Sequence, residues 1–336
     1  MQSRRTLADG LGRMPAVRVR AVIFTLTLNA AVDEAVSIGE FVLGGSNRCD
    51  LDAIDAGGKG INAARVIHRL GRQTIALGFV GGVTGGMLRA RLDAEGVLHA
   101  FDEVDGLTRL NVMVYERVSG RRSRMYLPGA HVEPARLKSI RLRLSQAPSG
   151  GVVVLGGSLP PGLRDDTYAE LVGWLHQRGV RAIVDTSGAA LARVLEAKPF
   201  LVKPNVEEAE ELLGTRIAGD DAALAAAREI RRRGAQCVVV SQGADGAVGV
   251  DAEGEWKARS PAVEARSTVG SGDSMIAGIA VAASEGGGLA EGLRLGTAAG
   301  AATAMVPGTQ LCHPQEVERL RLLVGIERIA LQPAQM

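Results

Sequence analysis

The sequence predicts an α/β protein with a doubly wound, mostly parallel β-sheet that is flanked by helices. Three observations predict this fold class. The chain has 336 residues, of which 46% are hydrophobic, so it is long enough for one large core. Between residues 152 and 241, short β-branched apolar runs alternate with segments of helical periodicity. Strands that are separated by helices of this length join in a parallel sheet.

The first half of the chain contains fewer regular elements. Apolar patterning predicts strands at 21–28 and 74–80 and helices at 60–70 and 85–95. The segment 38–54 is polar and predicts a protruding flap outside the core. Residues 111–127 alternate on either side of Ser119 and Gly120, which predicts a β-hairpin.

The second half is regular. It predicts strands at 152–155, 180–185, 200–202 and 237–241, with helices at 166–177, 189–196, 206–213 and 220–233. A terminal hairpin follows at 247–250 and 256–258, and the small-residue segment 274–304 predicts helix. We expect one domain over residues 20–325, a flexible N-terminal extension at 1–19 and a C-terminal tail at 326–336.

Composition excludes several classes of function. A net charge of only +2 gives no signal for nucleic acid or an acidic membrane surface. The sequence holds no apolar run of the ~18 residues that a membrane span needs. Cys49, Cys237 and Cys312 are scattered without metal-ligand spacing, which is typical of a reducing, cytoplasmic location. The five histidines also lack ligand spacing, and we expect them to be structural.

The segment 267–274 is the strongest functional signal. It places Gly270 and Gly272, with Ser271 between them, where a loop becomes a helix. Unpaired N–H groups at a helix start bind anions, and glycine lets a phosphate approach the backbone closely. Asp273 follows directly, and a carboxylate beside a phosphate is explained if it accepts a proton. The alternative interpretation is an N-capping Asp after a glycine turn.

Further polar loops follow the predicted parallel strands. They lie at 157–162, 185–188, 203–205 and 241–246, each directly after a strand. Because the carboxyl ends of parallel strands meet at one edge of a sheet, we expect these loops to form one rim. Ligands of such sheets bind beyond that edge.

A second glycine cluster covers residues 57–63. Gly58, Gly60 and Ala63 match the dinucleotide pattern G-x-G-x-x-A, but the next strand does not end in the acid that a nicotinamide site needs. A Walker loop is also missing, because Lys59 is followed by Gly60. The cluster opens a helix, so its N–H groups and Asn62 can contact ligand hydroxyls.

Asn205 and Glu208 stand three residues apart at a helix start, so both side chains face the same way. Two interpretations are open. Their oxygen atoms suit Mg²⁺, bound through water. Equally, Asn205 can be an N-cap with Glu208 as its capping-box partner.

Together these motifs resemble, in sequence order over about residues 20–325, those of the ribokinase-like carbohydrate kinases. The resemblance is carried by residues 25–29 with Asp33, 57–64, Thr108 and Arg109 with Asn111, 157–162, 203–205 with Glu208, and 267–274. Within that family the chain is most similar to the hexose-phosphate branch, which holds type 2 6-phosphofructokinases, 1-phosphofructokinases and tagatose-6-phosphate kinases.

The resemblance implies an ATP-dependent kinase that uses Mg²⁺. Asp273 is then the base that takes the proton of the sugar hydroxyl, and the backbone of Gly270, Ser271 and Gly272 stabilises the transferring phosphoryl group. Asn205 and Glu208 organise the water shell of Mg²⁺. The residues that the resemblance assigns to ATP are Lys203, Asn205, Ser241, Gly243 and Gly246. Those that it assigns to the sugar phosphate are Asp33, Gly57, Gly58, Asn62, Arg109, Ser158 and Arg48.

The flap and the hairpin, at about 33–54 and 108–128, resemble the small β-sheet lid of the family, which closes on the sugar. The resemblance implies a homodimer through this lid, with Arg48 near a phosphate of the partner subunit. Family members also bind K⁺ near the anion loop. In this chain the carbonyl groups for it are those of Ser267, Val269, Thr303, Val306 and Gly308.

The resemblance does not point to a single sugar substrate. Residues 307–312 and the pair Arg48-Cys49 are similar to the 6-phosphofructokinases, whereas Lys59 is similar to the 1-phosphofructokinases and tagatose-phosphate kinases. Ser46, Ser271 and Gln242 depart from the usual pattern. We favour fructose 6-phosphate, phosphorylated at the C1 hydroxyl to fructose 1,6-bisphosphate. The alternatives are the other two kinases, or a non-catalytic sugar-phosphate sensor, which has no need of Asp273, Asn205 and Glu208.

Overall fold

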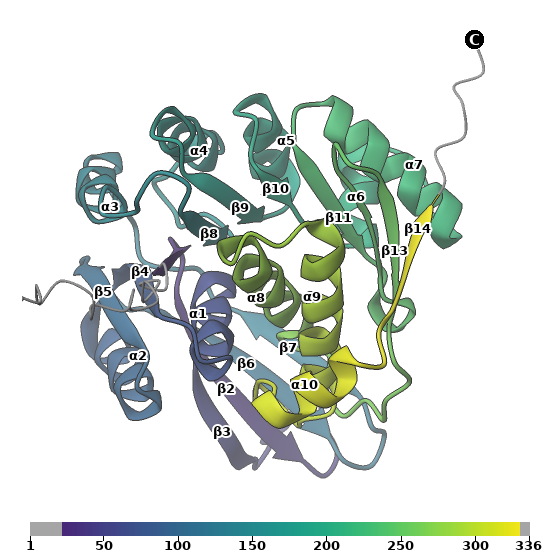
Figure 1. The fold of residues 1–336 in the computed structure, drawn as a ribbon. Coiled ribbons are helices and arrows are strands. Elements are labelled where there is room, and N and C mark those ends of the chain that lie inside the picture. The colour runs from purple at the N-terminus through teal and green to yellow at the C-terminus, as the bar shows by residue number, and fades with distance from the viewer. Residues whose placement is uncertain (1–21, 330–336) are drawn as a thin grey trace, which may run out of the picture.

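The computed structural model describes residues 22–329, and it has the predicted doubly wound α/β architecture (Figure 1). A ten-stranded sheet has the order β14-β13-β12-β11-β10-β9-β8-β1-β4-β5. Its parallel strands are β1 (Ile23–Thr27), β4 (Thr74–Val80), β5 (Leu98–Glu103), β8 (Val152–Gly156), β9 (Arg181–Asp185), β10 (Leu201–Val202) and β11 (Cys237–Ser241). Antiparallel strands complete one edge: β12 (Ala247–Val250), β13 (Glu255–Arg259) and β14 (Gly325–Ile329).

Apolar helix faces cover both sides of this sheet, because its central strands are apolar on both faces. In β8, Val153 and Leu155 belong to one core, while Val152 and Val154 belong to the other. The first core is completed by α3 (Leu137–Leu144), α4 (Thr167–Gln177), α5 (Gly188–Glu196), α6 (Val206–Leu213) and α7 (Gly219–Arg232). The second is completed by α1 (Lys59–Arg69), α8 (Ser271–Ser284), α9 (Leu289–Ala304) and α10 (Pro314–Arg321).

A separate four-stranded sheet of order β3-β2-β6-β7 lies in the lower part of Figure 1. It consists of β2 (Ala31–Ile38), β3 (Asp50–Gly57), β6 (Arg109–Glu116) and β7 (Arg122–Tyr126). The predicted hairpin is confirmed, since β6 and β7 are antiparallel. The predicted flap contains more regular structure than expected, because β2 pairs with both β3 and β6. We call this four-stranded sheet the lid. A third core packs α2 (Gly82–Glu95) between the lid and α1.

One predicted boundary and the predicted edge of the large sheet need correction. The division between domain and tail after residue 325 falls inside β14 (Gly325–Ile329), which pairs with β13 along its whole length. The edge of the large sheet is therefore β14 and not the predicted hairpin β12–β13. The rest of the predicted tail and the predicted extension at 1–19 lie outside the described residues. None of the helices within 22–329 is long and apolar enough to cross a membrane.

Candidate active site

The predicted rim of loops is present. Strands β8, β9, β10 and β11 are parallel neighbours, so the loops that follow them open at one edge of the sheet. The N-terminus of α8 lies at the same edge, because the Lys203 ammonium after β10 lies 3.4 Å from where a Cβ on Gly272 would be. Asn62 of α1 reaches Asp273 of α8 from the other side.

The anion loop begins α8 as expected from its glycines. Gly270 is the N-cap and adopts the left-handed conformation, with φ of 77°. Asp273 lies in the first turn, and α8 has no side-chain cap hydrogen bond, so the alternative interpretation of Asp273 as an N-cap is wrong. Ser271 Oγ is buried and has no hydrogen-bond partner among residues 22–329. The loop therefore presents helix N–H groups beside a carboxyl group that does not cap them.

Asp273 is held in a state suited to accepting a proton. Asn62 Nδ2 donates a 2.8 Å hydrogen bond to its Oδ2. Burial, and then the charge of Asp185, raise the pKa of Asp273 to about 6, while Lys59, Asn62 and Lys203 act against that rise. A general base works best when its pKa lies near the operating pH.

Asp185 connects two lysines at the centre of the rim. Its Oδ1 lies 2.8 Å from Lys59 Nζ, and its Oδ2 lies 3.2 Å from Lys203 Nζ. Burial alone would raise the pKa of Asp185, but Lys203 and Lys59 outweigh burial and lower it. Burial alone would likewise lower the pKa of Lys59, but Asp185 and Glu208 raise it. Lys59 thus remains charged, and Lys203 lies beside the anion loop, so both lysines are placed to stabilise phosphates.

Asp185 and Lys59 have no role predicted from the sequence, and the structure brings both into the site. A signal for Asp185 existed, because it is the one acid of β9 and directly follows the apolar residues 182–184 at the carboxyl end of the strand. Lys59 was visible as a lysine inside a glycine cluster. What no pattern indicated was that the two side chains meet across 126 residues of sequence.

Asn205 and Glu208 form the capping box that one interpretation predicted. Glu208 N donates to Asn205 Oδ1 at 2.7 Å, and Asn205 N donates to Glu208 Oε2 at 2.9 Å. Glu208 Oε1 points toward Lys59 Nζ at 3.3 Å. Over the described range, no group of three or more His, Cys, Asp or Glu side chains could hold a metal by itself. The oxygen atoms fit Mg²⁺ that is bound mainly by water and ligand phosphates.

The lid contributes Asp33 on β2. Asn111 of β6 stands opposite it in register and donates a 2.7 Å hydrogen bond from Nδ2 to Asp33 Oδ1. Burial raises the pKa of Asp33. A Cβ at Gly57 would overlap this carboxyl group, so only glycine allows the backbone before α1 to pack against Asp33. The sugar-side candidates Asp33, Gly57, Gly58 and Asn62 therefore lie on adjoining segments.

Arg109 is a half-buried cation at the start of β6. Its Nε is buried without a hydrogen-bond partner in the described part of the chain, and burial lowers its pKa despite the charge of Asp33. Such an unsatisfied guanidinium is suited to an incoming anion. Ser158 is exposed after β8 and accepts a 3.1 Å hydrogen bond from Asn29 Nδ2. Arg48 is exposed between β2 and β3, and within residues 22–329 no hydrogen bond or ion pair joins it to Arg109 or Ser158.

The candidates for nucleotide binding cluster after β11. Ser241 ends that strand, its N donates to Pro204 O at 3.0 Å, and it pairs with Asn205. Gly243 and Gly246 flank a single 3₁₀ turn with φ of 62° and 104°. These residues therefore adjoin Lys203 and Asn205 on the rim.

The five residues predicted for K⁺ lie on two adjoining segments, the anion loop before α8 and the end of α9 with the loop that follows it. Ser267 Oγ donates to Gly308 O at 2.7 Å, and Val306 N donates to Thr303 O at 3.2 Å. Val269 N donates to Ser267 Oγ at 3.3 Å. The group of carbonyls is thus present, although two of them already accept a hydrogen bond within these segments.

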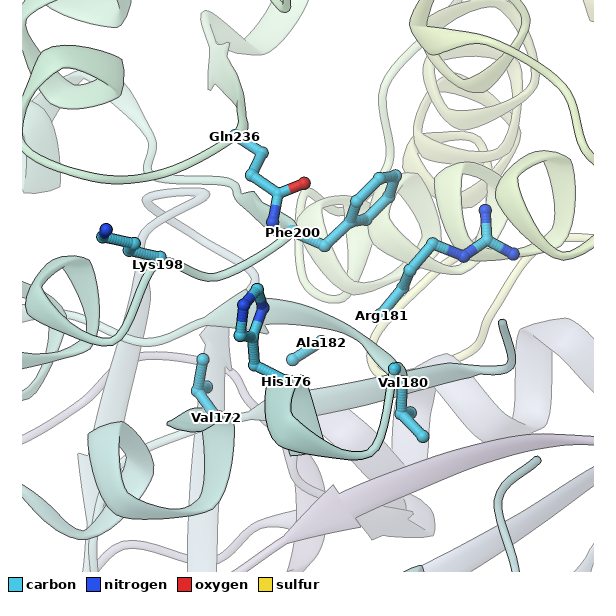
Figure 2. Close-up of a pocket in the computed structure, with 9 residues that line it drawn as sticks. Val172, His176, Val180, Arg181, Ala182, Lys198, Phe200 and Gln236 are labelled. Carbon is cyan, nitrogen blue, oxygen red and sulfur yellow. The ribbon is translucent and has the colours of Figure 1, made fainter. Parts of the chain in front are cut away.

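A separate surface pocket of about 200 Å³ lies at the opposite, amino-terminal edge of the strands (Figure 2). Two of the residues that line the pocket are Arg181, which begins β9, and Phe200, which directly precedes β10. His176 lies in the last turn of α4, and Lys198 follows the C-terminus of α5, where its side chain complements the helix carbonyls. The pocket is not part of the candidate active site.

The fold and the site together define an enzyme that transfers a phosphoryl group to a hydroxyl group. The pattern described as pfkB family carbohydrate kinase matches residues 26–316, and the chain belongs to this family. It is a sugar-phosphate kinase, similar to enzymes that act on phosphorylated fructose.

Two curated relatives show this similarity. ATP-dependent 6-phosphofructokinase isozyme 2 of Escherichia coli is 36% identical over 300 residues, covering 89% of this chain and 97% of the relative. The 1-phosphofructokinase of Bacillus subtilis is 37% identical over 308 residues, covering 92% and 100%.

Solved structures show the same similarity. Phosphofructokinase-2 of Escherichia coli in complex with potassium superposes with a TM-score of 0.86 at 36% identity, covering 90% of this chain and 99% of that chain. A ribokinase of Thermotoga maritima has a TM-score of 0.74 at 20% identity, covering 89% and 99%, and it supports the fold alone.

Proposed function

We propose that this enzyme transfers the γ-phosphoryl group of ATP to the C1 hydroxyl of fructose 6-phosphate, giving fructose 1,6-bisphosphate and ADP. The observation that carries the proposal is the half-buried Asp273 at the start of α8, whose carboxyl group accepts a hydrogen bond from Asn62 and whose pKa is raised to about 6. In the reaction, Asp273 takes the hydroxyl proton while the C1 oxygen forms a bond to the γ-phosphorus. The bond from that phosphorus to the bridging oxygen breaks, and its electron pair leaves with ADP.

Charge stabilisation is assigned to residues of the rim. The N–H groups of Gly270, Ser271 and Gly272 face the transferring group, and Lys59 and Lys203 contribute positive charge. Phosphoryl transfer depends mainly on such positioning and electrostatics. Mg²⁺, when bound near Asn205 and Glu208, supplies further neutralisation of the phosphate charge.

The sugar phosphate is assigned to the lid side. Asp33, Gly57, Gly58 and Asn62 hold hydroxyl groups, while Arg109 and Ser158 bind the phosphate. The unpaired Nε of Arg109 supports this assignment. ATP is assigned to Lys203, Asn205, Ser241, Gly243 and Gly246, which adjoin each other after β10 and β11. We also propose that K⁺ binds at the carbonyl groups of Ser267, Val269, Thr303, Val306 and Gly308. A comparison of the activity in potassium salts with that in tetramethylammonium salts tests this proposal.

The choice of fructose 6-phosphate rests on residues 307–312 and Arg48-Cys49, because the curated relatives include both kinds of phosphofructokinase. Initial rates with fructose 6-phosphate, fructose 1-phosphate and tagatose 6-phosphate, each at several concentrations, decide it. We expect the highest kcat/KM with fructose 6-phosphate. If another sugar phosphate gives a higher kcat/KM, that sugar phosphate is the substrate instead. If none of the three leads to release of ADP, the result favours a non-catalytic sensor.

A further inference from the structure

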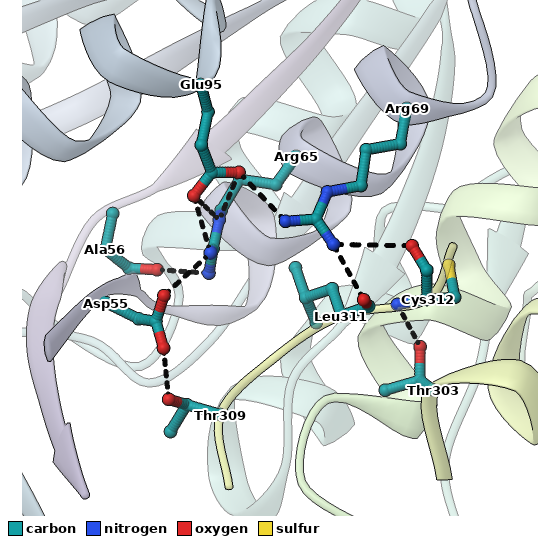
Figure 3. Close-up of polar contacts among 9 residues, drawn as sticks. All are labelled: Asp55, Ala56, Arg65, Arg69, Glu95, Thr303, Thr309, Leu311 and Cys312. Atoms are coloured by element: carbon teal, nitrogen blue, oxygen red, sulfur yellow. Dashed lines mark hydrogen bonds and ion pairs between the residues drawn. The ribbon is translucent and has the colours of Figure 1, made fainter. Parts of the chain in front are cut away.

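One buried ionic cluster lies behind the active site and has no part in the proposed chemistry. Its centre is Arg65, in the middle of α1 and only 2% exposed. Arg65 Nε donates to both carboxylate oxygens of Glu95 at 2.9 and 3.0 Å, at the end of α2 (Figure 3). Its Nη1 donates to Ala56 O at 2.9 Å, and its Nη2 donates to Asp55 Oδ1 at 3.0 Å. Arg65 therefore joins α1, α2 and the lid strand β3.

The second oxygen of Asp55 extends this cluster to another part of the chain. Asp55 Oδ2 accepts a hydrogen bond from Oγ1 of Thr309, a buried residue in the loop between α9 and α10 (Figure 3). That loop also contacts the anion loop. Its Gly308 O accepts from Ser267 Oγ at 2.7 Å, and the side chain of Leu311 packs against Gly270.

Arg69 fixes the same loop to α1 one turn further on. Its Nη1 donates to Leu311 O at 2.7 Å and to Cys312 O at 3.3 Å, and its Nη2 donates to Glu95 Oε2 at 3.3 Å. Burial alone would raise the pKa of Glu95, but Arg65 and Arg69 lower it, so Glu95 stays ionised between them. Arg69 thus fastens the loop to α1, and Thr309 hydrogen-bonds it to the lid.

On the lid side, the cluster ends next to the sugar site. Asp55 of β3 stands directly opposite Asp33 of β2 in the strand register. A continuous series of contacts therefore leads from Asp33, through Asp55 and Thr309, to the loop that holds Gly270.

We propose that Asp55, Arg65 and Thr309 form a lid bridge, which sets the position of the sugar-binding lid relative to the anion loop. This inference rests on the roles proposed above for Asp33 and Asp273. The three residues do not touch the reacting atoms, so they are positioning residues. Alignment of the sugar hydroxyl with Asp273 depends on them, and a misplacement of about 1 Å can cost ~10²-fold in rate.

Thr309 allows a matched test. Thr309→Val keeps the shape and removes the hydroxyl donor, whereas Thr309→Ser keeps the donor. With the best of the three ketohexose phosphates, we expect Thr309→Val to lower kcat about tenfold while KM for ATP changes less than about twofold. Thr309→Ser should remain near the wild-type kcat. Because Asp55 and Thr309 act through one contact, Asp55→Asn combined with Thr309→Val should be no worse than the more severe single variant.

Amide hydrogen exchange supplies a readout that does not need turnover. Thr309→Val should speed exchange in both residues 50–57 and 305–313, and fructose 6-phosphate should protect 305–313 in the wild type only. Equal kcat in the valine, serine and wild-type enzymes overturns the bridge, as does a lowered melting temperature with unchanged kcat. Wild-type inactivity with all three sugars instead counts against the proposed function. In that case the lid bridge is still tested on its own. It is overturned if amide exchange in residues 50–57 and 305–313 is the same in Thr309→Val as in the wild type.

Discussion

Asn62 Nδ2 lies 2.8 Å from Asp273 Oδ2 and joins the first turn of α1 to the first turn of α8. The two helices begin with the two glycine-rich segments of the chain, one predicted for the sugar and the other for the phosphoryl group. The hydrogen bond therefore connects the two halves of the proposed reaction. It also favours the ionised form of Asp273, which burial disfavours.

The proposed base is tested by Asp273→Asn. The variant keeps the size of the side chain but cannot accept the proton, so we expect kcat to fall at least ~10²-fold. Binding of ATP and sugar phosphate, measured by calorimetry, should persist because the loops and lysines are unchanged. Turnover close to wild type would remove Asp273 from the mechanism.

The pH dependence of the reaction follows from the same group. Asp273 must be deprotonated to act, so kcat/KM should fall as the pH decreases through about 6. Lys59 lowers the pKa of Asp273, and Lys59→Met should therefore move this acidic limb to higher pH. Lys138→Met, an exposed change on α3, is the matched control and should leave the profile in place. An identical acidic limb in both variants would show that Lys59 does not act on the base.

How far the sequence predicts this molecule depends on the range of the interactions involved. The strand 74–80 was predicted with its observed bounds, because a short apolar run is a local property of the sequence. The strand β14 was missed, since only its pairing with β13 makes Gly325–Ile329 a strand. The burial of Arg65 was not predicted, because arginine is rarely buried and its partners come from two other segments, α2 and β3.

Phosphate recognition is tested by Arg109→Ala. The guanidinium is half-buried with its Nε unpaired, so an incoming phosphate gains a charged, bidentate donor there. We expect KM for the sugar phosphate to rise at least about tenfold, the equivalent of ~1.4 kcal/mol, with KM for ATP changed little. Arg109→Lys should restore little, because an ammonium cannot bind two oxygens in parallel. Equal changes in both KM values would place Arg109 outside the sugar site.

The last prediction concerns assembly. The lid exposes a group of large apolar side chains: Phe41, Val42, Leu43, Leu51, Tyr115, Met125, Tyr126 and Leu127. A small sheet with such a surface and open edges is marginal alone, and a two-fold interface between two lids would cover it. The related phosphofructokinase-2 of Escherichia coli has a tetrameric inhibited form.

We propose a homodimer through the lid, with Arg48 acting on the partner's sugar phosphate, and expect a dimer at micromolar concentration in sedimentation. Leu51→Glu should favour the monomer and raise KM for the sugar phosphate, because a charge in the interface loses its hydration. Leu142→Glu is the matched control, since Leu142 is equally exposed but lies on α3, away from the lid. Full activity in a monomeric wild-type enzyme would contradict the proposal, because the lid would then close on the sugar without a second copy.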